Sequence, residues 1–290
     1  VFVSSSDIGA GSEYFMGLGI GNYNGDVSID SSNISGSGGG IGNDGTGKIR
    51  VYNGSHVSGK NIGGIGNNGL GGVEISGGSI IDSEYGGGIL NNAGGVSVSG
   101  NSLISAVGTG IENYGPDGVT VTDSRIDSVN NDGIDNHAGG VIVSNSEISG
   151  GYAAISNTGE GGVEVYSGIL AGGRDLYNYY GLYSGSEGYG IYNTAGNVTI
   201  DNTNVYSPAT GIYNSGNDVK ILNGTHISSR YNGITNAYEG EGGVEVVDSS
   251  IESWENSGIG NYATAKGVTV TNSVIHGGYY GIDNSGVDGV

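Results

Sequence analysis

Two carboxylate side chains, Glu112 and Asp135, occupy equivalent places in the sequence and are of the type that performs acid/base chemistry. Glu112 lies in the stretch GTGIENYGPD and Asp135 in the stretch NDGIDNHAGG, so each stands between an isoleucine and an asparagine. Glycosidases use such a pair of carboxyl groups, and a retaining enzyme holds them about 5 Å apart. Glu112 and Asp135 are therefore the candidate catalytic residues of a polysaccharide-degrading glycosidase or lyase.

Both residues belong to a repeated tetrad, Gly-Ile-x-Asn, in which they fill the variable third place. The tetrad occurs twelve times, once with Ala in place of Gly, at intervals of 21 to 25 residues and one interval of 36. The copies begin at Gly19, Gly40, Gly64, Gly88, Gly110, Gly133, Ala154, Gly190, Gly211, Gly233, Gly258 and Gly281. Because the repeat explains the place of Asp135 without chemistry, the favoured prediction assigns no catalytic residue and treats the pair as the alternative.

The residues that follow each tetrad predict two more short strands. After a Gly-rich turn comes a β-branched–x–β-branched triplet such as Val119-Thr120-Val121, and then a third apolar position, expected at Ile126, Ile148 and Ile169 among others. Ser or Thr usually stands two residues before that position and predicts an inward polar column. Three short strands in about 22 residues, bounded by Gly and Asn, predict one coil of a parallel β-helix.

The asparagine of the tetrad fills the same place in every coil. The twelve residues are Asn22, Asn43, Asn67, Asn91, Asn113, Asn136, Asn157, Asn193, Asn214, Asn236, Asn261 and Asn284. Asn tolerates positive φ at a sharp bend better than other non-Gly residues, so we expect this conformation here. Stacked Asn side chains can also hydrogen-bond from one coil to the next and satisfy buried amides.

The Gly-Ile-x-Asn column, together with the Val-x-Val and Ser-x-Ile strands, resembles the right-handed parallel β-helices of the pectin-lyase-like superfamily. The acidic, Cys-free and Gly/Asn-rich repeats look most like the passenger domain of a bacterial autotransporter. This resemblance covers residues 1–290 as a single β-helix domain. It implies an all-β, right-handed solenoid of about 12 coils with an Asn ladder, located outside the cell or on a bacterial cell surface.

A narrower similarity concerns the carboxylate pair. The stretch NNDGIDN is similar to the NTDGID segment of polygalacturonases, in which an Asp serves in glycoside hydrolysis. The Asp-Asp pair, the Gly-His-Gly and the Arg-x-Lys that accompany this segment in that family have no counterparts here. The similarity therefore keeps Glu112 and Asp135 as the alternative and does not make them the favoured site.

Composition limits the partners. The chain of 290 residues carries 29 acidic and 8 basic residues, which gives a net charge of −21. Such a surface disfavours nucleic acid and anionic membranes, and no apolar run is long enough for membrane insertion of this region. No cofactor or metal site is assigned. Acidic residues in the turns leave Ca²⁺ binding open as an alternative, and these residues are Asp117, Glu160, Asp218, Glu239 and Glu241.

The single long interval, between Ile155 and Ile191, marks an inserted Tyr-rich loop at 170–189. Insertions in solenoids map to loops that often lie on the binding face, and aromatic rings stack on sugars and anchor interfaces. The alternative is that Tyr only covers strand faces. The predicted ligand-binding residues are Tyr177, Tyr179, Tyr180, Tyr183, Tyr189, Tyr192 and Tyr213.

These observations predict a non-catalytic extracellular rod, an adhesin-like passenger domain that binds host or surface glycans or proteins. Two alternatives remain: a polysaccharide-degrading enzyme and a self-assembling structural filament subunit. The chain begins and ends in phase with the repeat, at Val1 and Val290, and neither end carries a cap. We therefore expect either a fragment of a longer solenoid or head-to-tail self-association.

Overall fold

A computed structural model of the chain describes residues 1–11, 16–173, 188–237, 242–262, 266–286 and 288–290. The described residues form 36 short strands and no helix, which confirms the predicted all-β class. Accordingly, this part of the chain contains no helix with the length and apolarity needed to cross a membrane. The residues fall into two compact units, Val1–Gly139 and Gly140–Val290, each of which is a β-solenoid of six coils.

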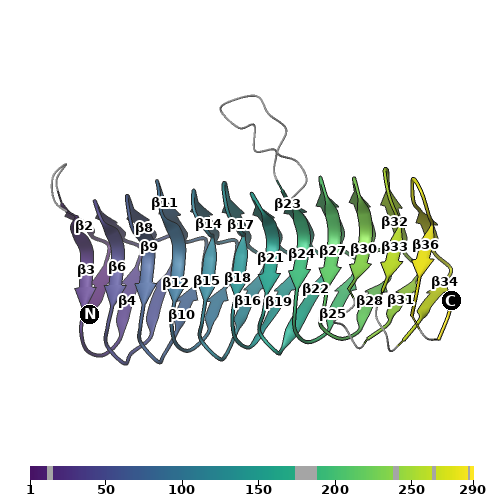
Figure 1. Cartoon of the computed structure of the whole chain (residues 1–290). Helices are drawn as coiled ribbons and strands as arrows, with labels where there is room; N and C mark the ends of the chain where they lie inside the picture. The colour runs from purple at the N-terminus through teal and green to yellow at the C-terminus, as the bar shows by residue number, and fades with distance from the viewer. Residues whose placement is uncertain (12–15, 174–187, 238–241, 263–265, 287) are drawn as a thin grey trace. The chain divides into compact units, whose positions relative to one another are not determined.

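Each coil of the first unit contributes one strand to each of three parallel sheets (Figure 1). The triplet sheet contains β1 (Phe2–Ser4), β4 (Val27–Asp30), β7 (Ile49–Tyr52), β10 (Val73–Ile75), β13 (Val96–Val98) and β16 (Val119–Thr122). The serine sheet contains β2 (Asp7–Ala10), β5 (Asn33–Gly36), β8 (His56–Gly59), β11 (Ile80–Ser83), β14 (Leu103–Ala106) and β17 (Arg125–Ser128). The tetrad sheet contains β3 (Leu18–Asn22), β6 (Gly39–Asn43), β9 (Gly63–Asn67), β12 (Gly87–Asn91), β15 (Ile111–Asn113) and β18 (Ile134–Asn136).

The second unit repeats this arrangement. Its triplet sheet contains β19 (Gly140–Ser144), β22 (Gly162–Tyr166), β25 (Val198–Asp201), β28 (Val219–Leu222), β31 (Val244–Val247) and β34 (Val268–Thr271). Its serine sheet contains β20 (Glu147–Gly150), β23 (Ile169–Gly172), β26 (Asn204–Ser207), β29 (His226–Ser229), β32 (Ser250–Ser253) and β35 (Val274–His276). Its tetrad sheet contains β21 (Ala153–Asn157), β24 (Tyr189–Asn193), β27 (Thr210–Asn214), β30 (Asn232–Asn236), β33 (Ile259–Asn261) and β36 (Ile282–Asn284).

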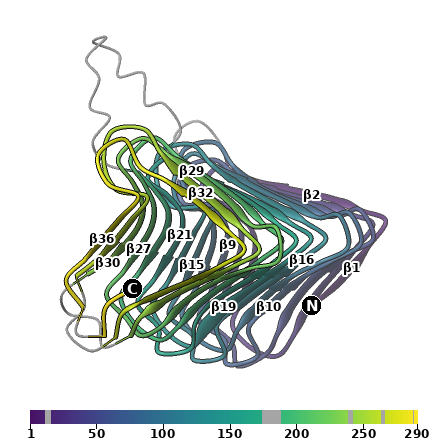
Figure 2. The same cartoon turned by 90° about the vertical axis from the view of Figure 1, so that its right-hand side faces the viewer.

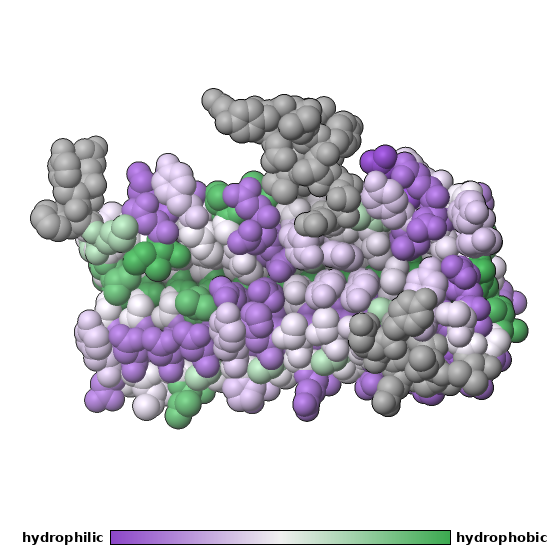
Figure 3. Space-filling view, viewed as in Figure 1, coloured by the Kyte–Doolittle hydropathy of each residue, from purple (hydrophilic) through white to green (hydrophobic). Residues whose placement is uncertain are grey.

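Strands pair in register, so equivalent residues of successive coils lie side by side. Val73 pairs with Val96, and Ile111 pairs with Ile134. In the end-on view, the three-sided coils within each unit follow one another (Figure 2). The isoleucines and valines of all three sheets fill the interior, and Val121, Ile126 and Ile134 are fully buried. Side chains of alternate residues face solvent, and hydrophilic ones form a row from coil to coil on the first unit (Figure 3).

The predicted Asn ladder is present in both units. The side-chain amide of Asn113 donates to Oδ1 of Asn136 at 2.8 Å, and that of Asn193 donates to Oδ1 of Asn214 at 2.8 Å. Each of these four side chains is fully buried. The ladder therefore satisfies polar groups that have no access to water, as the sequence predicted.

The expected positive φ of these asparagines is wrong. None of the twelve ladder asparagines, all within the described ranges, has positive φ. Among the non-Gly residues, positive φ occurs instead at the corner between the triplet and serine sheets, for example at Asn53, Asn101 and Asn145, with φ of 56°, 61° and 47°. That corner takes the chain from one sheet to the next, whereas a ladder Asn is the last residue of its strand, so its backbone stays extended and its side chain points inward.

The predicted inward Ser/Thr column is also present. The backbone N–H of Ser102 donates to Oγ of Ser124 at 3.2 Å, so a hydroxyl of one coil satisfies the backbone of the coil before it. In the coil that precedes the insertion, Gly168 occupies this place and donates its N–H to Oγ1 of Thr203 at 3.1 Å. The expected inward position Ile169 is wrong, because Ile169 is 42% exposed and Leu170 is fully buried opposite Ile148.

The tetrad glycine is required by close approach between coils. A Cβ on Gly40 would lie 2.5 Å from Cγ1 of Val57, the inward residue of the next coil, and 2.7 Å from the carbonyl oxygen of Gly64. Ala154 is the one exception and is fully buried. Its neighbour in the next coil is Leu170, which is not branched at Cβ, so the branch that would meet Ala154 is missing.

Candidate functional site

The two candidate carboxylates lie side by side on the outer face of the tetrad sheet. Glu112 of β15 pairs directly with Asp135 of β18. Their neighbours Ile111 and Ile134 are fully buried, so the alternation of the strand turns both carboxylates outward. Their equivalent places in the repeat thus bring the two residues side by side, and both side chains are half-buried.

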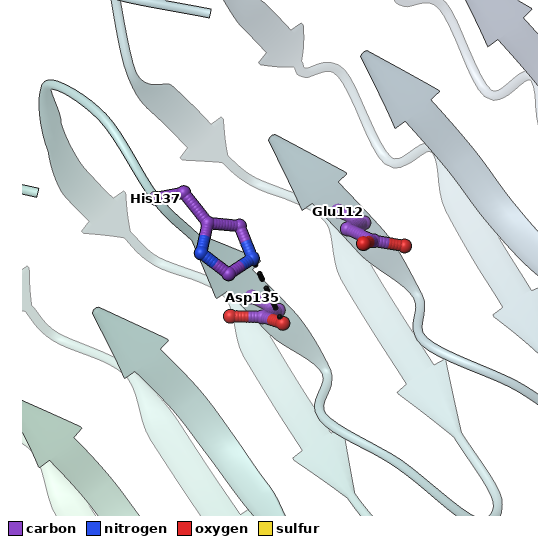
Figure 4. Close-up of side chains that lie close together, drawn as sticks. All are labelled: Glu112, Asp135 and His137. Carbon is purple, nitrogen blue, oxygen red and sulfur yellow. Dashed lines mark ion pairs between the residues drawn. The ribbon is translucent and has the colours of Figure 1, made fainter. Parts of the chain in front are cut away.

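A histidine completes this site. His137 directly follows β18, and its Nε2 lies 3.2 Å from Oδ2 of Asp135. Ligand atoms of Glu112, Asp135 and His137 all lie within 4.8 Å of one another. Figure 4 shows the three side chains close together, with Glu112 and Asp135 on neighbouring strands and His137 just beyond the second strand. The repeat did not indicate His137 as part of this site, although a residue two positions after Asp135 projects to the same side of an extended chain.

Tyr114 is the corresponding neighbour of Glu112. Its hydroxyl donates to Oε1 of Glu112 at 2.7 Å, and its ring stacks on the His137 ring with centroids 4.3 Å apart and an interplanar angle of 4°. Hydrogen bonding to the Glu112 carboxylate, together with burial and the charges of Glu112 and Asp135, raises the pKa of Tyr114 to about 12. The four side chains thus form two adjacent pairs, one acidic and one aromatic.

Two surface hollows lie away from the carboxylate pair. One in the first unit is lined by residues that include Ser37, Lys60 and Glu84, and one in the second unit by residues that include Asp218 and Lys266. Of the described residues, those that line these hollows include neither Glu112 nor Asp135. Neither of these two hollows encloses the carboxylate pair, which lies on the outer face of the tetrad sheet.

The second candidate site is a group of tyrosines on the outer face of the second unit. Tyr192 of β24 and Tyr213 of β27 are paired in the sheet, and their rings stack with centroids 5.0 Å apart and an interplanar angle of 10°. The Tyr189 ring lies 5.2 Å from that of Tyr192 and 6.0 Å from that of Tyr213. Three of the predicted ligand-binding tyrosines therefore lie side by side in the structure.

Tyr152 joins this group and was not predicted. Its ring meets that of Tyr189 edge-on, with centroids 5.5 Å apart. We call Tyr152, Tyr189, Tyr192 and Tyr213 the tyrosine face; all four are half-buried. The repeat offers no signal for Tyr152, because it lies in the turn before β21 and outside the repeating positions. The remaining predicted ligand-binding residues lie outside the described residues, and they are Tyr177, Tyr179, Tyr180 and Tyr183.

The acidic residue Asp218, one of those proposed for Ca²⁺ binding, is already paired with a lysine. The Lys266 ammonium donates to both carboxylate oxygens of Asp218, at 2.8 and 3.0 Å, and the N–H of Gly243 donates to Oδ1 at 3.0 Å. The Lys266 hydrogen bond and that of Gly243 lower the pKa of Asp218 despite its partial burial. Glu239 and Glu241 lie outside the described residues. Within the described chain, the grouping of three candidate metal ligands is therefore Glu112, Asp135 and His137.

No protein-family model matches this chain, and no curated protein matches it. The β-solenoid is shown by the structure, whereas membership of the pectin-lyase-like superfamily and the likeness to autotransporter passenger domains stay predictions.

Proposed function

We propose that this chain is a non-catalytic extracellular recognition module that binds glycans through the tyrosine face. The observation that carries the proposal is the parallel stack of Tyr192 on Tyr213 on an outward sheet surface. The C–H face of a sugar ring packs on the apolar face of an aromatic ring, and the phenol supplies a polar edge. Tyr189 and Tyr152 extend the same surface to the border of the inserted loop.

The solenoid supports this role by holding the rings in place. Tyr189 and Tyr192 lie on β24 and Tyr213 on β27, and the isoleucines that precede Tyr192 and Tyr213, Ile191 and Ile212, are fully buried. A binding surface that is already ordered loses less conformational entropy when the ligand binds. The net charge of −21 repels acidic polymers, so the proposal favours neutral or basic glycans over acidic ones.

The proposal is tested by a glycan array followed by titration of the best ligand. Replacing Tyr192 and Tyr213 by Ser is expected to weaken binding by about tenfold or more, because each lost stacking contact is worth about 0.5–1.5 kcal/mol. A matched control replaces Tyr279 and Tyr280, another neighbouring pair with ring centroids 4.5 Å apart. Equal affinity of both double variants for the ligand, with unchanged far-UV circular dichroism, would exclude the tyrosine face.

A second candidate function, polysaccharide cleavage, is favoured by one observation, the direct pairing of Glu112 with Asp135. Adjacent parallel strands lie about 4.8 Å apart, close to the spacing of a retaining carboxylate pair. Reducing-end release from neutral and acidic polysaccharides tests this alternative. Activity that disappears in both Glu112→Gln and Asp135→Asn would replace the recognition proposal with the enzymatic one.

A further inference from the structure

We propose that Glu112, Asp135 and His137 form a binding site for a divalent transition-metal ion such as Zn²⁺. The three residues offer two carboxylates and one imidazole, and their ligand atoms lie within 4.8 Å of one another. Three protein ligands that leave a fourth position to water are one of the common arrangements of protein-bound zinc. This proposal does not depend on glycan binding by the tyrosine face.

The distances suit a tetrahedral ion. Bonds of about 2.0–2.1 Å place neighbouring ligand atoms of a tetrahedral zinc about 3.3 Å apart. Nε2 of His137 and Oδ2 of Asp135 are separated by 3.2 Å, so they already span one edge of such a tetrahedron. Glu112 stands on the neighbouring strand in direct register with Asp135, and its longer side chain can complete the set by rotation.

A second observation, independent of the ligand types, concerns the histidine. Nε2 of His137 is buried and makes no hydrogen bond of good geometry with the described residues, although it faces Asp135. The stacked Tyr114 ring fixes the plane of the imidazole, and the Tyr114 hydroxyl holds Glu112 at 2.7 Å. Such partners orient ligands around protein-bound metals, so Tyr114 acts here as a positioning residue.

The donor set selects the class of ion. Imidazole suits Zn²⁺, Cu²⁺ and Ni²⁺, whereas Ca²⁺ takes six to eight oxygen ligands. Two carboxylates supply only part of an oxygen shell, so we expect Zn²⁺ to bind and Ca²⁺ not to displace it. The net charge of −21 further raises the local concentration of cations near the site.

Calorimetric titration of the tag-free, EDTA-treated full chain with ZnCl₂ tests the proposal. We expect one equivalent to bind. His137→Phe keeps the stack on Tyr114 but removes the donor nitrogen, and Glu112→Gln removes a charged ligand. Loss of an outer partner costs about 10–100-fold in affinity, so each of these changes is expected to cost on the order of 100-fold.

The matched control is another histidine–carboxylate pair of the first unit. Nε2 of His56 lies 2.9 Å from Oδ1 of Asp82, and no third ligand joins them among the described residues. His56→Phe is expected to bind one equivalent of Zn²⁺ as tightly as the wild type. Binding with unchanged affinity in His137→Phe or Glu112→Gln, or no saturable binding by the wild type, overturns the proposal. Far-UV circular dichroism confirms that each variant is folded.

Discussion

At the scale of the residue, small changes of side-chain shape decide whether two coils can approach. Where a Cβ added to a tetrad glycine would meet a side chain of the next coil, that side chain is β-branched. Gly40, for example, faces Val57, and Gly110 faces Ile126. Ala154 breaks the column where the next coil offers Leu170. The extra Cβ of Ala154 is accommodated because Leu170 is not branched at Cβ and carries its branch one carbon further out.

Leu170→Ile is therefore expected to destabilise the protein by about 1–3 kcal/mol, because the added branch overpacks the space against Ala154. Adding Ala154→Gly should recover most of this loss. Urea unfolding of the two single variants and the double variant measures the coupling. Additive effects would show that the two residues do not meet.

Asp218 gives the clearest dependence on pH. Its folded-state pKa is lowered from the ordinary value of 3.8, first by the hydrogen bond from Lys266. The stabilisation is therefore complete above about pH 3.8 and is lost as the pH falls through the lowered pKa. Asp218→Asn and Lys266→Ala should both flatten the decline of the urea midpoint below pH 4. A wild-type slope in both variants would contradict this assignment.

Residue positions that repeat could be predicted, and positions outside the repeat could not. Glu112 and Asp135 share one column, so the register alone brings them together. The alternation of the strand would place the His137 side chain on the same face as Asp135, but only if the chain stays extended beyond Asn136, where β18 ends. Tyr152 reaches the tyrosine face from a turn, and the path of that turn is set by tertiary packing rather than by any periodic signal.

At the scale of the element, the Asn ladder joins the coils of each unit. Asn113 accepts a hydrogen bond from Asn91 at 2.7 Å, donates to Asn136 at 2.8 Å and accepts the N–H of Gly115 at 3.2 Å. Its side chain is fully buried, so water cannot replace these partners. One side chain thus satisfies groups in three successive coils.

Asn113→Ala is expected to lower the free energy of unfolding by about 2–4 kcal/mol, because more than one buried group loses its partner at about 1–3 kcal/mol each. The control is Asn92→Ala, which removes an exposed ladder bond of 2.7 Å to Asn68. That change should cost less than about 0.5 kcal/mol. Denaturant unfolding compares the two, and equal losses would argue against the buried ladder as a main source of stability.

The strands themselves were predictable wherever the markers of the repeat were complete. The prediction failed at Ile169 because two apolar residues, Ile169 and Leu170, stand side by side and Gly168 replaces the usual Ser or Thr. Alternation alone cannot choose between adjacent apolar residues. The corner with positive φ was missed because Ser, Asn, Asp and Gly share it, so no single residue type marks it.

At the scale of the whole molecule, repulsion among the excess acidic residues destabilises the folded state. A net charge of −21 repels itself, and only 8 basic residues offset 29 acidic ones. Raising the ionic strength from 10 to 300 mM shortens the screening length from about 30 Å to below about 10 Å. The thermal midpoint is therefore expected to rise with added NaCl, measured by circular dichroism. A falling midpoint would mean that ion pairs such as Lys266 with Asp218 outweigh the repulsion.

Charge also bears on the filament alternative. Like-charged molecules associate poorly at low salt, so head-to-tail self-association would increase with ionic strength. Sedimentation velocity across the same range of salt and of protein concentration measures this. A constant sedimentation coefficient is expected for a recognition module, whereas growth with concentration would favour the filament subunit.

Saturation-transfer NMR detects directly whether a bound sugar contacts the rings of the tyrosine face. Irradiation of the aromatic protons, with the best glycan from the array present, should transfer saturation to the C–H protons of the sugar ring. We expect this transfer to be lost when Tyr192 and Tyr213 are replaced by Ser and kept when Tyr279 and Tyr280 are replaced. Undiminished transfer in the Tyr192 and Tyr213 double variant would contradict it.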